Sequence, residues 1–203
     1  MPILDIINTN SSKIIFYQTE KFKIEDLLIS KLPISDIEII NNTIGTPRKT
    51  ERFGARLAAL NILKSSYKGI SYLKNGRPYL IDSTKYISIS HTKDIICLLI
   101  SDTQKIGIDI QYQSKKITNV AKRVFNDREL TWANNELDKL TQLWCIKETV
   151  YKASQIQGLS FIKDISITPQ AKSFSVRILS GKVIKLYTVE TTKFNEYCVA
   201  YTL

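Results

Sequence analysis

Apolar and polar residues alternate along residues 105–111, Lys-Ile-Gly-Ile-Asp-Ile-Gln. A period of two predicts a β-strand, with three isoleucines on one face and Gly107, Asp109 and Gln111 on the other. Asp is uncommon in strands because it gains little from packing there, so Asp109 indicates a functional or structural requirement. Gly107 on the same face predicts that another part of the chain approaches the backbone closely.

A second informative stretch, residues 143–153, has helical periodicity. Its apolar residues recur at intervals of three, four and three positions and form a core-facing stripe. Trp144, Glu148 and Lys152 follow one another at intervals of four on a different face. The carboxylates of Asp109 and Glu148 are ligands of the kind that Mg2+ prefers, with phosphates and water completing its coordination.

The remaining pattern mixes helices with strands and predicts an α+β fold with antiparallel strands. Helical spacing occurs at Ile24–Leu32, Ser35–Ile44, Arg48–Lys64, Thr118–Phe125, Asp127–Asn135 and Leu137–Gln155. Strand patterns occur at Lys13–Thr19, Tyr86–Ser90, Asp94–Ser101, Lys105–Gln111, Asp164–Thr168, Phe174–Leu179, Lys182–Glu190 and Tyr197–Leu203. Turns are expected at Ser180-Gly181 and Thr192-Lys193, and a short hairpin connection is expected at residues 102–104.

The helix predicted after Pro47 carries a basic stripe. Arg48, Arg52 and Arg56 follow one another at intervals of four, on a different face from the apolar residues. One interpretation is a solvated basic face. The other is anion capture at the start of the helix, where unpaired N–H groups and the helix dipole favour phosphate. We expect Arg56 to be structural.

Length and composition restrict the class of protein. The 203 residues suffice for one domain or two small halves, and 43% hydrophobic with 24% charged residues is ordinary for a globular chain. The longest apolar run, residues 95–100, is too short to cross a bilayer, and no signal peptide is recognised at the N-terminus. Three widely separated cysteines predict neither a metal site nor a disulfide framework, and a cytoplasmic location is expected.

The net charge of +10 favours polyanionic partners. Nucleic acid is one candidate and a phosphate-rich coenzyme is another. Nucleic-acid binding would call for aromatic residues interleaved with basic ones on one surface, whereas the ten tyrosines are scattered, mostly at strand positions.

Four short motifs in order resemble the 4'-phosphopantetheinyl transferase superfamily. Its two-part signature is similar to Gly107-Ile108-Asp109-Ile110 followed by Trp144-x-x-Lys147-Glu148-x-x-x-Lys152. Upstream, Gly76-Arg77-Pro78 and a strand that ends in Ser90-His91 are similar to the earlier motifs of that family. The resemblance covers residues 76–152, and the chain length suits the long, single-chain (surfactin-synthetase-activating) type.

The resemblance implies two similar halves related by a pseudo-two-fold axis, each with helices packed on a roughly three-stranded antiparallel sheet. The N-terminal half, residues 1–110, would contain the basic helix, the Gly-Arg-Pro loop and the Ser-His strand end. The C-terminal half, residues 111–203, would contain the Trp-x-x-Lys-Glu helix. No linker-like stretch separates the halves, so we expect them to pack as one unit and the protein to be a monomer.

The implied activity is that of a holo-[acyl-carrier-protein] synthase. It is the Mg2+-dependent transfer of 4'-phosphopantetheine from coenzyme A to a serine of an acidic apo carrier protein, with release of 3',5'-ADP. Neither a membrane nor nucleic acid is an expected partner.

The resemblance also implies roles for particular residues. Asp109 and Glu148 would hold Mg2+, Glu148 would accept the serine proton, and Lys152 would meet the pyrophosphate. Trp144 is expected to pack and not to contact the substrate. The residues expected to bind the coenzyme are Arg48, Lys49, Arg77, Ser90, His91, Lys147 and Lys152.

Gln111 departs from the family pattern, because many members have a second acid at that position. Its neutral oxygen would ligate the metal weakly or through water, so we expect weaker Mg2+ affinity than in proteins with three acids. Two alternatives stay open beside the transferase and the nucleic-acid binder. One is a relative that only binds carrier proteins, and the other is an ion-pair cluster of Asp109, Glu148 and Lys152 without catalytic function.

Overall fold

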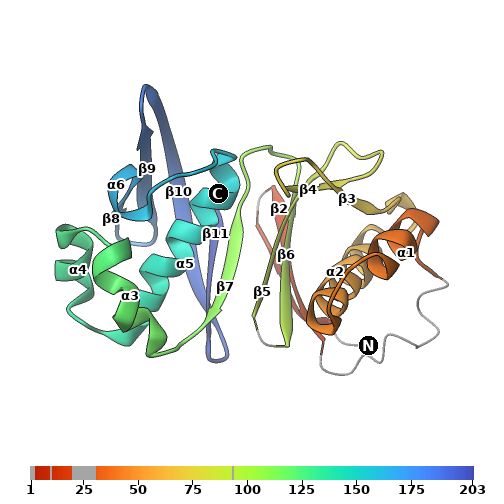
Figure 1. Ribbon diagram of the computed structural model, residues 1–203, viewed down its shortest axis with the longest axis horizontal. Coiled ribbons are helices and arrows are strands. Elements are labelled where there is room, and N and C mark those ends of the chain that lie inside the picture. Colours follow the sequence, from red (N-terminus) through yellow and green to blue (C-terminus); the bar gives the residue numbers. More distant parts are fainter. Residues whose placement is uncertain (1–2, 10, 20–30, 93) are drawn as a thin grey trace. The chain divides into compact units, whose positions relative to one another are not determined.

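The computed structural model of the chain describes residues 3–9, 11–19, 31–92 and 94–203, and it divides the chain into two compact units, residues 1–104 and 105–203. Each unit combines helices with an antiparallel sheet, which confirms the predicted α+β class (Figure 1). The division falls at 104/105, six residues before the expected boundary at 110/111, so the strand that carries Asp109 belongs to the second unit.

The first unit contains a four-stranded sheet in the order β1-β2-β6-β5, with all neighbours antiparallel. Helices α1 and α2 cover one face of this sheet, and β3 and β4 form a separate hairpin (Figure 1). The elements are β1 Ile3–Asn8, β2 Ser12–Gln18, α1 Ile34–Asn41, α2 Thr46–Leu63, a 3-10 turn Lys64–Ser66, β3 Ile70–Tyr72, β4 Pro78–Leu80, β5 Tyr86–Thr92 and β6 Ile95–Ser101. The helix predicted at residues 24–32 lies largely outside the described residues.

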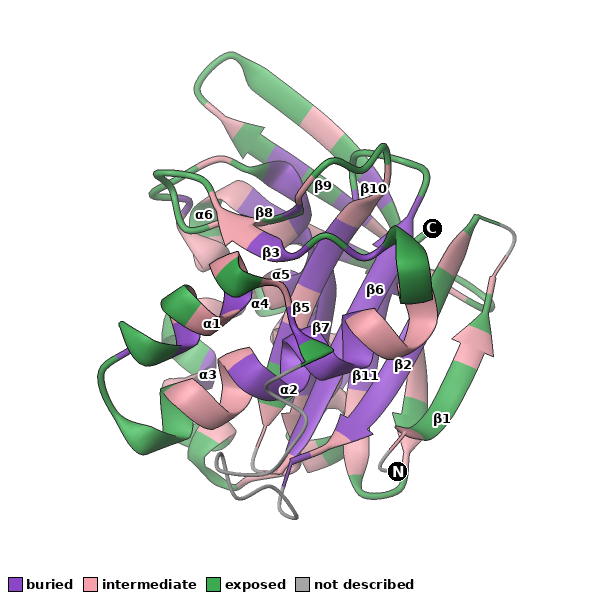
Figure 2. Ribbon diagram, turned by 90° about the vertical axis from the view of Figure 1, so that its right-hand side faces the viewer, coloured by how far each residue is buried: buried purple, intermediate pink, exposed green. Residues whose placement is uncertain are grey.

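Strand β6 explains why this sheet has a stable core. All seven of its residues are buried, as Figure 2 shows in purple, and β2 and β5 pair with it on either side. A continuous apolar run of this kind is typical of a central strand with both faces covered. The sequence pattern did not predict strand β1, because several of its side chains, Leu4 and Ile6 among them, are exposed at the edge of the sheet.

Arg56 has the structural role that the sequence predicted. Its side chain is fully buried, and its Nε atom lies 2.6 Å from Oδ1 of Asp36 in α1. Arg56 also donates to the carbonyl oxygen of Ile70, and the hydroxyl of Tyr67 donates to Asp36. The ion pair therefore fastens α2 to α1 and β3 and removes Arg56 from the basic surface of the helix, whereas Arg48 stays exposed.

The second unit contains a five-stranded antiparallel sheet in the order β7-β11-β10-β9-β8. The long helix α5 packs mainly on β7 and β11, and α3 and α4 lie on the same side of the sheet (Figure 1). The elements are β7 Ile108–Tyr112, α3 Lys116–Val124, α4 Asp127–Ala133, α5 Leu137–Ser154, α6 Phe161–Asp164, β8 Ile165–Pro169, β9 Phe174–Ser180, β10 Val183–Phe194 and β11 Tyr197–Thr202. The sheets thus have four and five strands, against the roughly three expected for each half.

The hairpin predicted at residues 102–104 is wrong. Strand β6 pairs with β2 and β5 in the first unit, whereas β7 pairs with β11 near the other end of the chain. The predicted turn at Thr192-Lys193 is also wrong, because β10 continues to Phe194 and the chain reverses at Asn195, which has a φ of +52°. Asn tolerates this left-handed conformation better than most residues.

Gly107 allows α5 to approach the start of β7, as the sequence predicted. A Cβ atom at this position would overlap the carbonyl oxygen of Thr149 in α5 and press on the side chain of Ala153. The amide of Gly107 donates to the hydroxyl of Thr202, which joins this segment to the end of β11. The small residue therefore determines how closely the helix lies against the strand that carries Asp109.

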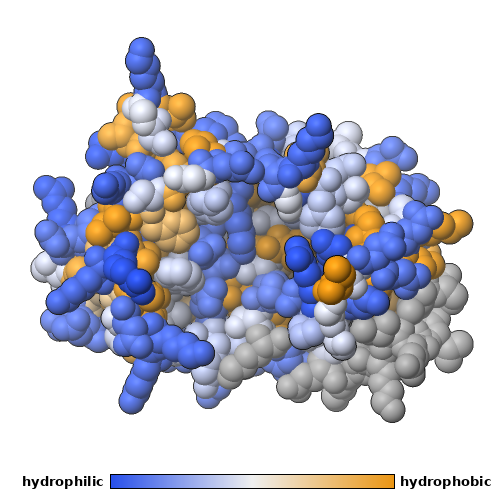
Figure 3. Space-filling model, viewed as in Figure 1, coloured by the Kyte–Doolittle hydropathy of each residue, from blue (hydrophilic) through white to orange (hydrophobic). Residues whose placement is uncertain are grey.

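An exposed apolar region lies on the second unit. Leu179, Val183, Ile184 and Leu186 expose large fractions of their side chains at the β9–β10 hairpin, where Figure 3 shows orange atoms beneath a blue tip. Among the described residues, no helix combines the length and the apolar character needed to cross a membrane.

Candidate functional site: an acid cluster on β7 and α5

Asp109 lies at the centre of a polar cluster inside the second unit. Its side chain is only 4% exposed and faces α5, where Nζ of Lys152 lies 2.7 Å from its Oδ1 atom. Lys152 also donates to the carbonyl oxygen of Ile108, and Nε2 of Gln111 donates to Oδ2 of Asp109 at 3.1 Å. We call Asp109, Gln111, Glu148 and Lys152 the acid cluster.

Glu148 joins this cluster from α5, one turn before Lys152. Its side chain is half-buried, and loss of hydration is the main cause that raises the pKa of its carboxyl group. The negative charge of Asp109 raises this pKa further, while Lys152 opposes the shift. The two carboxyl groups therefore lie within electrostatic reach of each other, and Lys152 forms its close ion pair with Asp109.

Hydrogen bonds hold α5 against the strands that carry the cluster. The thiol of Cys145, one turn before Glu148, donates to the backbone carbonyl of Asp109 at 3.2 Å, and burial raises the pKa of this thiol. Thr149 donates its hydroxyl to the carbonyl oxygen of Ala200 in β11 at 3.0 Å. These contacts fix the positions of Glu148 and Lys152 relative to β7. No sequence pattern indicated a role for Cys145 beyond its distance of three residues from Glu148.

The donor set of the acid cluster fits Mg2+ that also binds a phosphate-bearing substrate. Within residues 3–9, 11–19, 31–92 and 94–203, no group of three or more His, Cys, Asp or Glu side chains gathers as a metal site. The cluster instead offers two carboxylates, of Asp109 and Glu148, and the amide oxygen of Gln111. Mg2+ is commonly held in this way, by one or two carboxylates with substrate phosphates and water completing an octahedron.

Lys147 occupies a different environment from its neighbour Glu148. Its side chain is fully buried, and its Nζ lies 2.8 Å from Oε2 of Glu129 in α4. The same ammonium donates to the carbonyl oxygens of Phe161 and Ile165, so all three N–H donors have partners. Burial lowers the pKa of Lys147, and Glu129 opposes this shift. This placement argues against the coenzyme contact predicted for Lys147 and favours a structural role.

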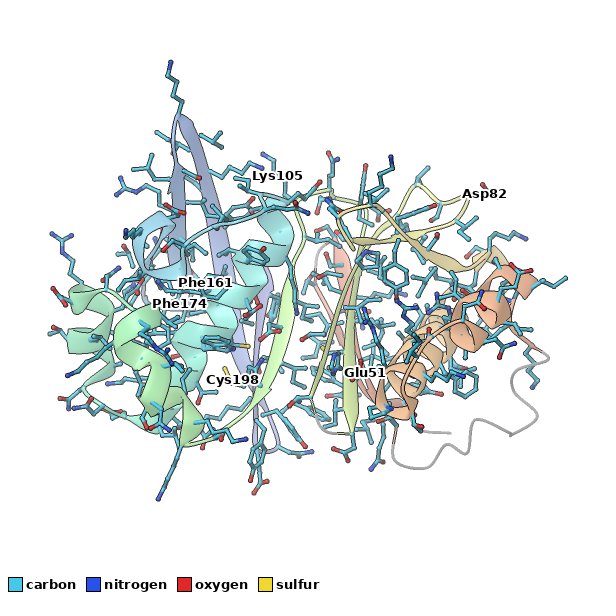
Figure 4. The ribbon with its side chains drawn as sticks, in the orientation of Figure 1. Glu51, Asp82, Lys105, Phe161, Phe174 and Cys198 are labelled. Atoms are coloured by element: carbon cyan, nitrogen blue, oxygen red, sulfur yellow. The ribbon has the colours of Figure 1, made fainter. Side chains whose placement is uncertain are left out.

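Trp144 packs as predicted. Its half-buried ring lies 5.8 Å from the ring of Phe161, centroid to centroid, beside α6 (Figure 4 labels Phe161).

The other residues predicted to bind the coenzyme belong to the first unit. Arg48 and Lys49 lie in the first turn of α2, where the helix has no side-chain cap. Arg77 donates to the carbonyl oxygen of Gln104 at 3.0 Å. Ser90 is buried in β5, and the next residue, His91, is exposed.

The structure adds Glu51 to this group. Its Oε1 atom lies 3.2 Å from Nδ1 of His91, so the second turn of α2 meets the Ser-His end of β5 (Figure 4 labels Glu51). The sequence alone did not indicate this contact, because the two residues are 40 positions apart and do not belong to the same motif.

Comparison with known proteins gives a family match over the second unit and three similar relatives. Residues 105–202, essentially the second unit, match the family model of the 4'-phosphopantetheinyl transferase superfamily. A Haemophilus influenzae protein provisionally named a 4'-phosphopantetheinyl transferase is 24% identical over 160 residues, or 71% of this chain. The 4'-phosphopantetheinyl transferase gsp of Aneurinibacillus migulanus is 29% identical over 46% of the chain, and HetI of Nostoc sp., another 4'-phosphopantetheinyl transferase, is 27% identical over 60%.

These matches show that the second unit is similar to the 4'-phosphopantetheinyl transferase superfamily, and the α+β fold of the chain is consistent with that similarity. The alignments span 66%, 42% and 58% of the three relatives' own lengths, in the order given above. The chain therefore corresponds to part of each relative.

Proposed function

We propose that this protein transfers 4'-phosphopantetheine from coenzyme A to a serine of an apo carrier protein, as a Mg2+-dependent cytoplasmic monomer. The observation that carries the proposal is the acid cluster, in which Asp109 and Glu148 lie within electrostatic reach and Lys152 is bonded to Asp109. A cluster of two carboxylates and one cation is suited to a reaction on a pyrophosphate.

Each residue of the cluster has a proposed task. Asp109 and Glu148 would hold Mg2+, and Gln111 would orient Asp109 through its N–H group while its oxygen binds the metal or a metal-bound water. The bound metal would neutralise charge that develops on the pyrophosphate oxygens. Lys152 adds a fixed positive charge at the same place.

Glu148 is the proposed general base. The serine hydroxyl of the carrier attacks the β-phosphorus of coenzyme A, its proton passes to Glu148 directly or through water, and the bond to 3',5'-ADP breaks. The half-buried carboxyl group of Glu148, one turn from Lys152 on α5, is suited to accept that proton. Its half-burial beside Asp109 supports this role.

Coenzyme binding is assigned to residues of the first unit. Arg48 and Lys49 combine positive charge with the N–H groups at the uncapped start of α2, which favours an anion such as the 3'-phosphate. Arg77, Ser90 and His91 are the further proposed contacts. Glu51 would orient the imidazole of His91 through the contact at Nδ1.

The test is a mass-shift assay with purified protein, coenzyme A, Mg2+ and an apo carrier protein. We expect the carrier to gain the mass of one phosphopantetheine group. Asp109→Asn and Glu148→Gln should each slow the transfer on the order of a thousandfold, since a metal and a base contribute several kcal/mol to the transition state. Glu136→Gln, an exposed change at the start of α5, is the matched control and should keep its rate.

The alternatives predict other outcomes of the same experiment. Carrier binding without mass gain, for several carriers, would favour a relative that only binds carrier proteins, which is the alternative that Gln111 supports. A salt-sensitive gel shift with random nucleic acid that coenzyme A leaves unchanged would favour a nucleic-acid-binding protein.

A further inference from the structure

Two cysteines lie directly beside the acid cluster, on facing elements. Cys145 is completely buried in α5, and Cys198 is partly exposed in β11. In the register of the sheet, Cys198 lies opposite Gln111 of β7 and opposite Lys193 of β10. Directly opposed residues on neighbouring antiparallel strands present their side chains on the same face, so Cys198 shares the face of Gln111.

The thiol of Cys145 contacts the backbone of Cys198. Its Sγ atom lies 3.5 Å from the carbonyl oxygen of Cys198. The same Sγ atom is the donor to the carbonyl of Asp109. Figure 4 labels Cys198 on β11 beside α5.

Only one of the two thiols is accessible. Cys198 lines a groove of about 620 Å³ formed by the end of β7, the start of α5 and the β10–β11 hairpin. Cys145 has no exposed surface. In such an arrangement, an oxidant can react with the exposed thiol, and the neighbouring buried thiol can then convert the resulting sulfenic acid to a disulfide.

We propose that Cys145 and Cys198 form an oxidisable dithiol, a modification site that a peroxide closes to a disulfide. Hydrogen peroxide oxidises the Cys198 thiol to a sulfenic acid and releases one water. The Cys145 sulfur then attacks the Cys198 sulfur, the S–S bond forms, and the hydroxyl leaves with the Cys145 proton as a second water. One peroxide is reduced and two thiols are oxidised.

The disulfide changes the surroundings of Asp109. A disulfide carries no S–H group, so the Asp109 carbonyl loses the hydrogen bond from Cys145. The new bond also ties α5 to β11 at the level of Gln111. A consequence that rests on the proposed function follows: oxidation should slow phosphopantetheine transfer at least fivefold, and a reducing agent should restore it.

The experiment treats the full chain with hydrogen peroxide, alkylates the remaining thiols after unfolding, and maps tryptic peptides by mass spectrometry. Cys145 lies in peptide 140–147 and Cys198 in peptide 194–203. We expect these peptides to be linked after peroxide and separate after dithiothreitol. Cys97, in peptide 94–105, is buried in β6 of the first unit and should stay alkylatable, so Cys97→Ala is the matched control.

Three outcomes would decide the proposal. Recovery of Cys198 as sulfinic acid, with Cys145 still alkylatable, would overturn it. Loss of the link in both Cys198→Ala and Cys198→Ser, together with peroxide-resistant transfer in these variants, would support it. The disulfide is detected by peptide mass and does not depend on transferase activity. A protein that forms the disulfide but shows no transfer in its reduced state would therefore refute the proposed function and leave the dithiol established.

Discussion

The carboxyl group of Glu148 lowers the stability of the fold when it is ionised, and it is also the proposed general base. Its carboxyl group is half-buried beside Asp109, and both features raise its pKa above the ordinary value of 4.5. The folded state therefore binds this proton more tightly than the unfolded state does. The stability that the protonated carboxyl group contributes is lost as the pH rises from its ordinary pKa through its raised pKa.

Glu148→Gln should for this reason raise the melting temperature at pH 7.5. The difference from the parent protein should shrink towards about pH 4, where the glutamate is protonated in both states. Thermal unfolding at several pH values measures this, with Glu136→Gln as the exposed control on the same helix. A stabilisation that is equal at all pH values would show that the carboxyl charge is not its cause.

Gln111 is the second residue whose chemistry can be tested directly. Its amide group donates to Asp109, so a glutamate at this position would replace a donor by a second negative charge. Gln111→Glu should bind Mg2+ more tightly than the parent protein, because a third carboxylate favours a hard cation. Titration calorimetry provides the measurement, and Gln113→Glu adds the same charge two residues further along. Equal affinity in the parent and Gln111→Glu would exclude a role for position 111 in metal binding.

Helix α5 is held in place by a buried ion pair as well as by its apolar stripe. Glu129 accepts hydrogen bonds from the amides of Asn126 and Ile167 in addition to its contact with Lys147. Both side chains are almost completely buried, so neither charge is hydrated by solvent. The pair joins α4, α5 and β8.

Removal of one partner of the pair should therefore lower the stability of the folded protein. Lys147→Met and Glu129→Gln should each lower the free energy of unfolding by about 3–5 kcal/mol, because each leaves an uncompensated buried group. The double variant should lose less than the sum of the two. Urea unfolding measures the cycle, and the exposed pair Lys139 with Glu136 serves as its control, at about 0–1 kcal/mol. Additive losses at Lys147 and Glu129 would contradict the interpretation.

At the scale of the whole molecule, the dominant property is the net charge of +10. It favours acidic partners over long distances, and the proposed substrates, coenzyme A and an acidic carrier, are both anionic. Charges that act across water are screened by salt, with a Debye length of about 10 Å at 0.1 M.

The KM for an acidic carrier should consequently rise several-fold between about 50 and 300 mM NaCl. The turnover number should change less, because salt screens the encounter more than the bonds inside the acid cluster. Steady-state kinetics with saturating coenzyme A measures both constants, and a carrier variant with its surface carboxylates substituted is the control. A KM that is independent of salt for the acidic carrier would argue against electrostatic steering.

Many elements could be predicted from the sequence, since periodicity and capping are local. Strand β7 and helix α5 were both recognisable from neighbouring residues. The sequence motifs also led to Asp109, Gln111, Glu148 and Lys152, which the structure brings together. The assignment of coenzyme contacts to the first unit, the packing of both units together and the bound Mg2+ stay predictions.

What the sequence by itself determined is the type of most helices and strands and which residues share a face, because these depend on neighbours a few positions away. Only the tertiary structure decided that β7 pairs with β11, that Lys147 is buried against Glu129, and that Cys145 touches Cys198. Each of these contacts joins residues that are distant in the chain. Their side chains have several compatible partners, and packing selects one of them.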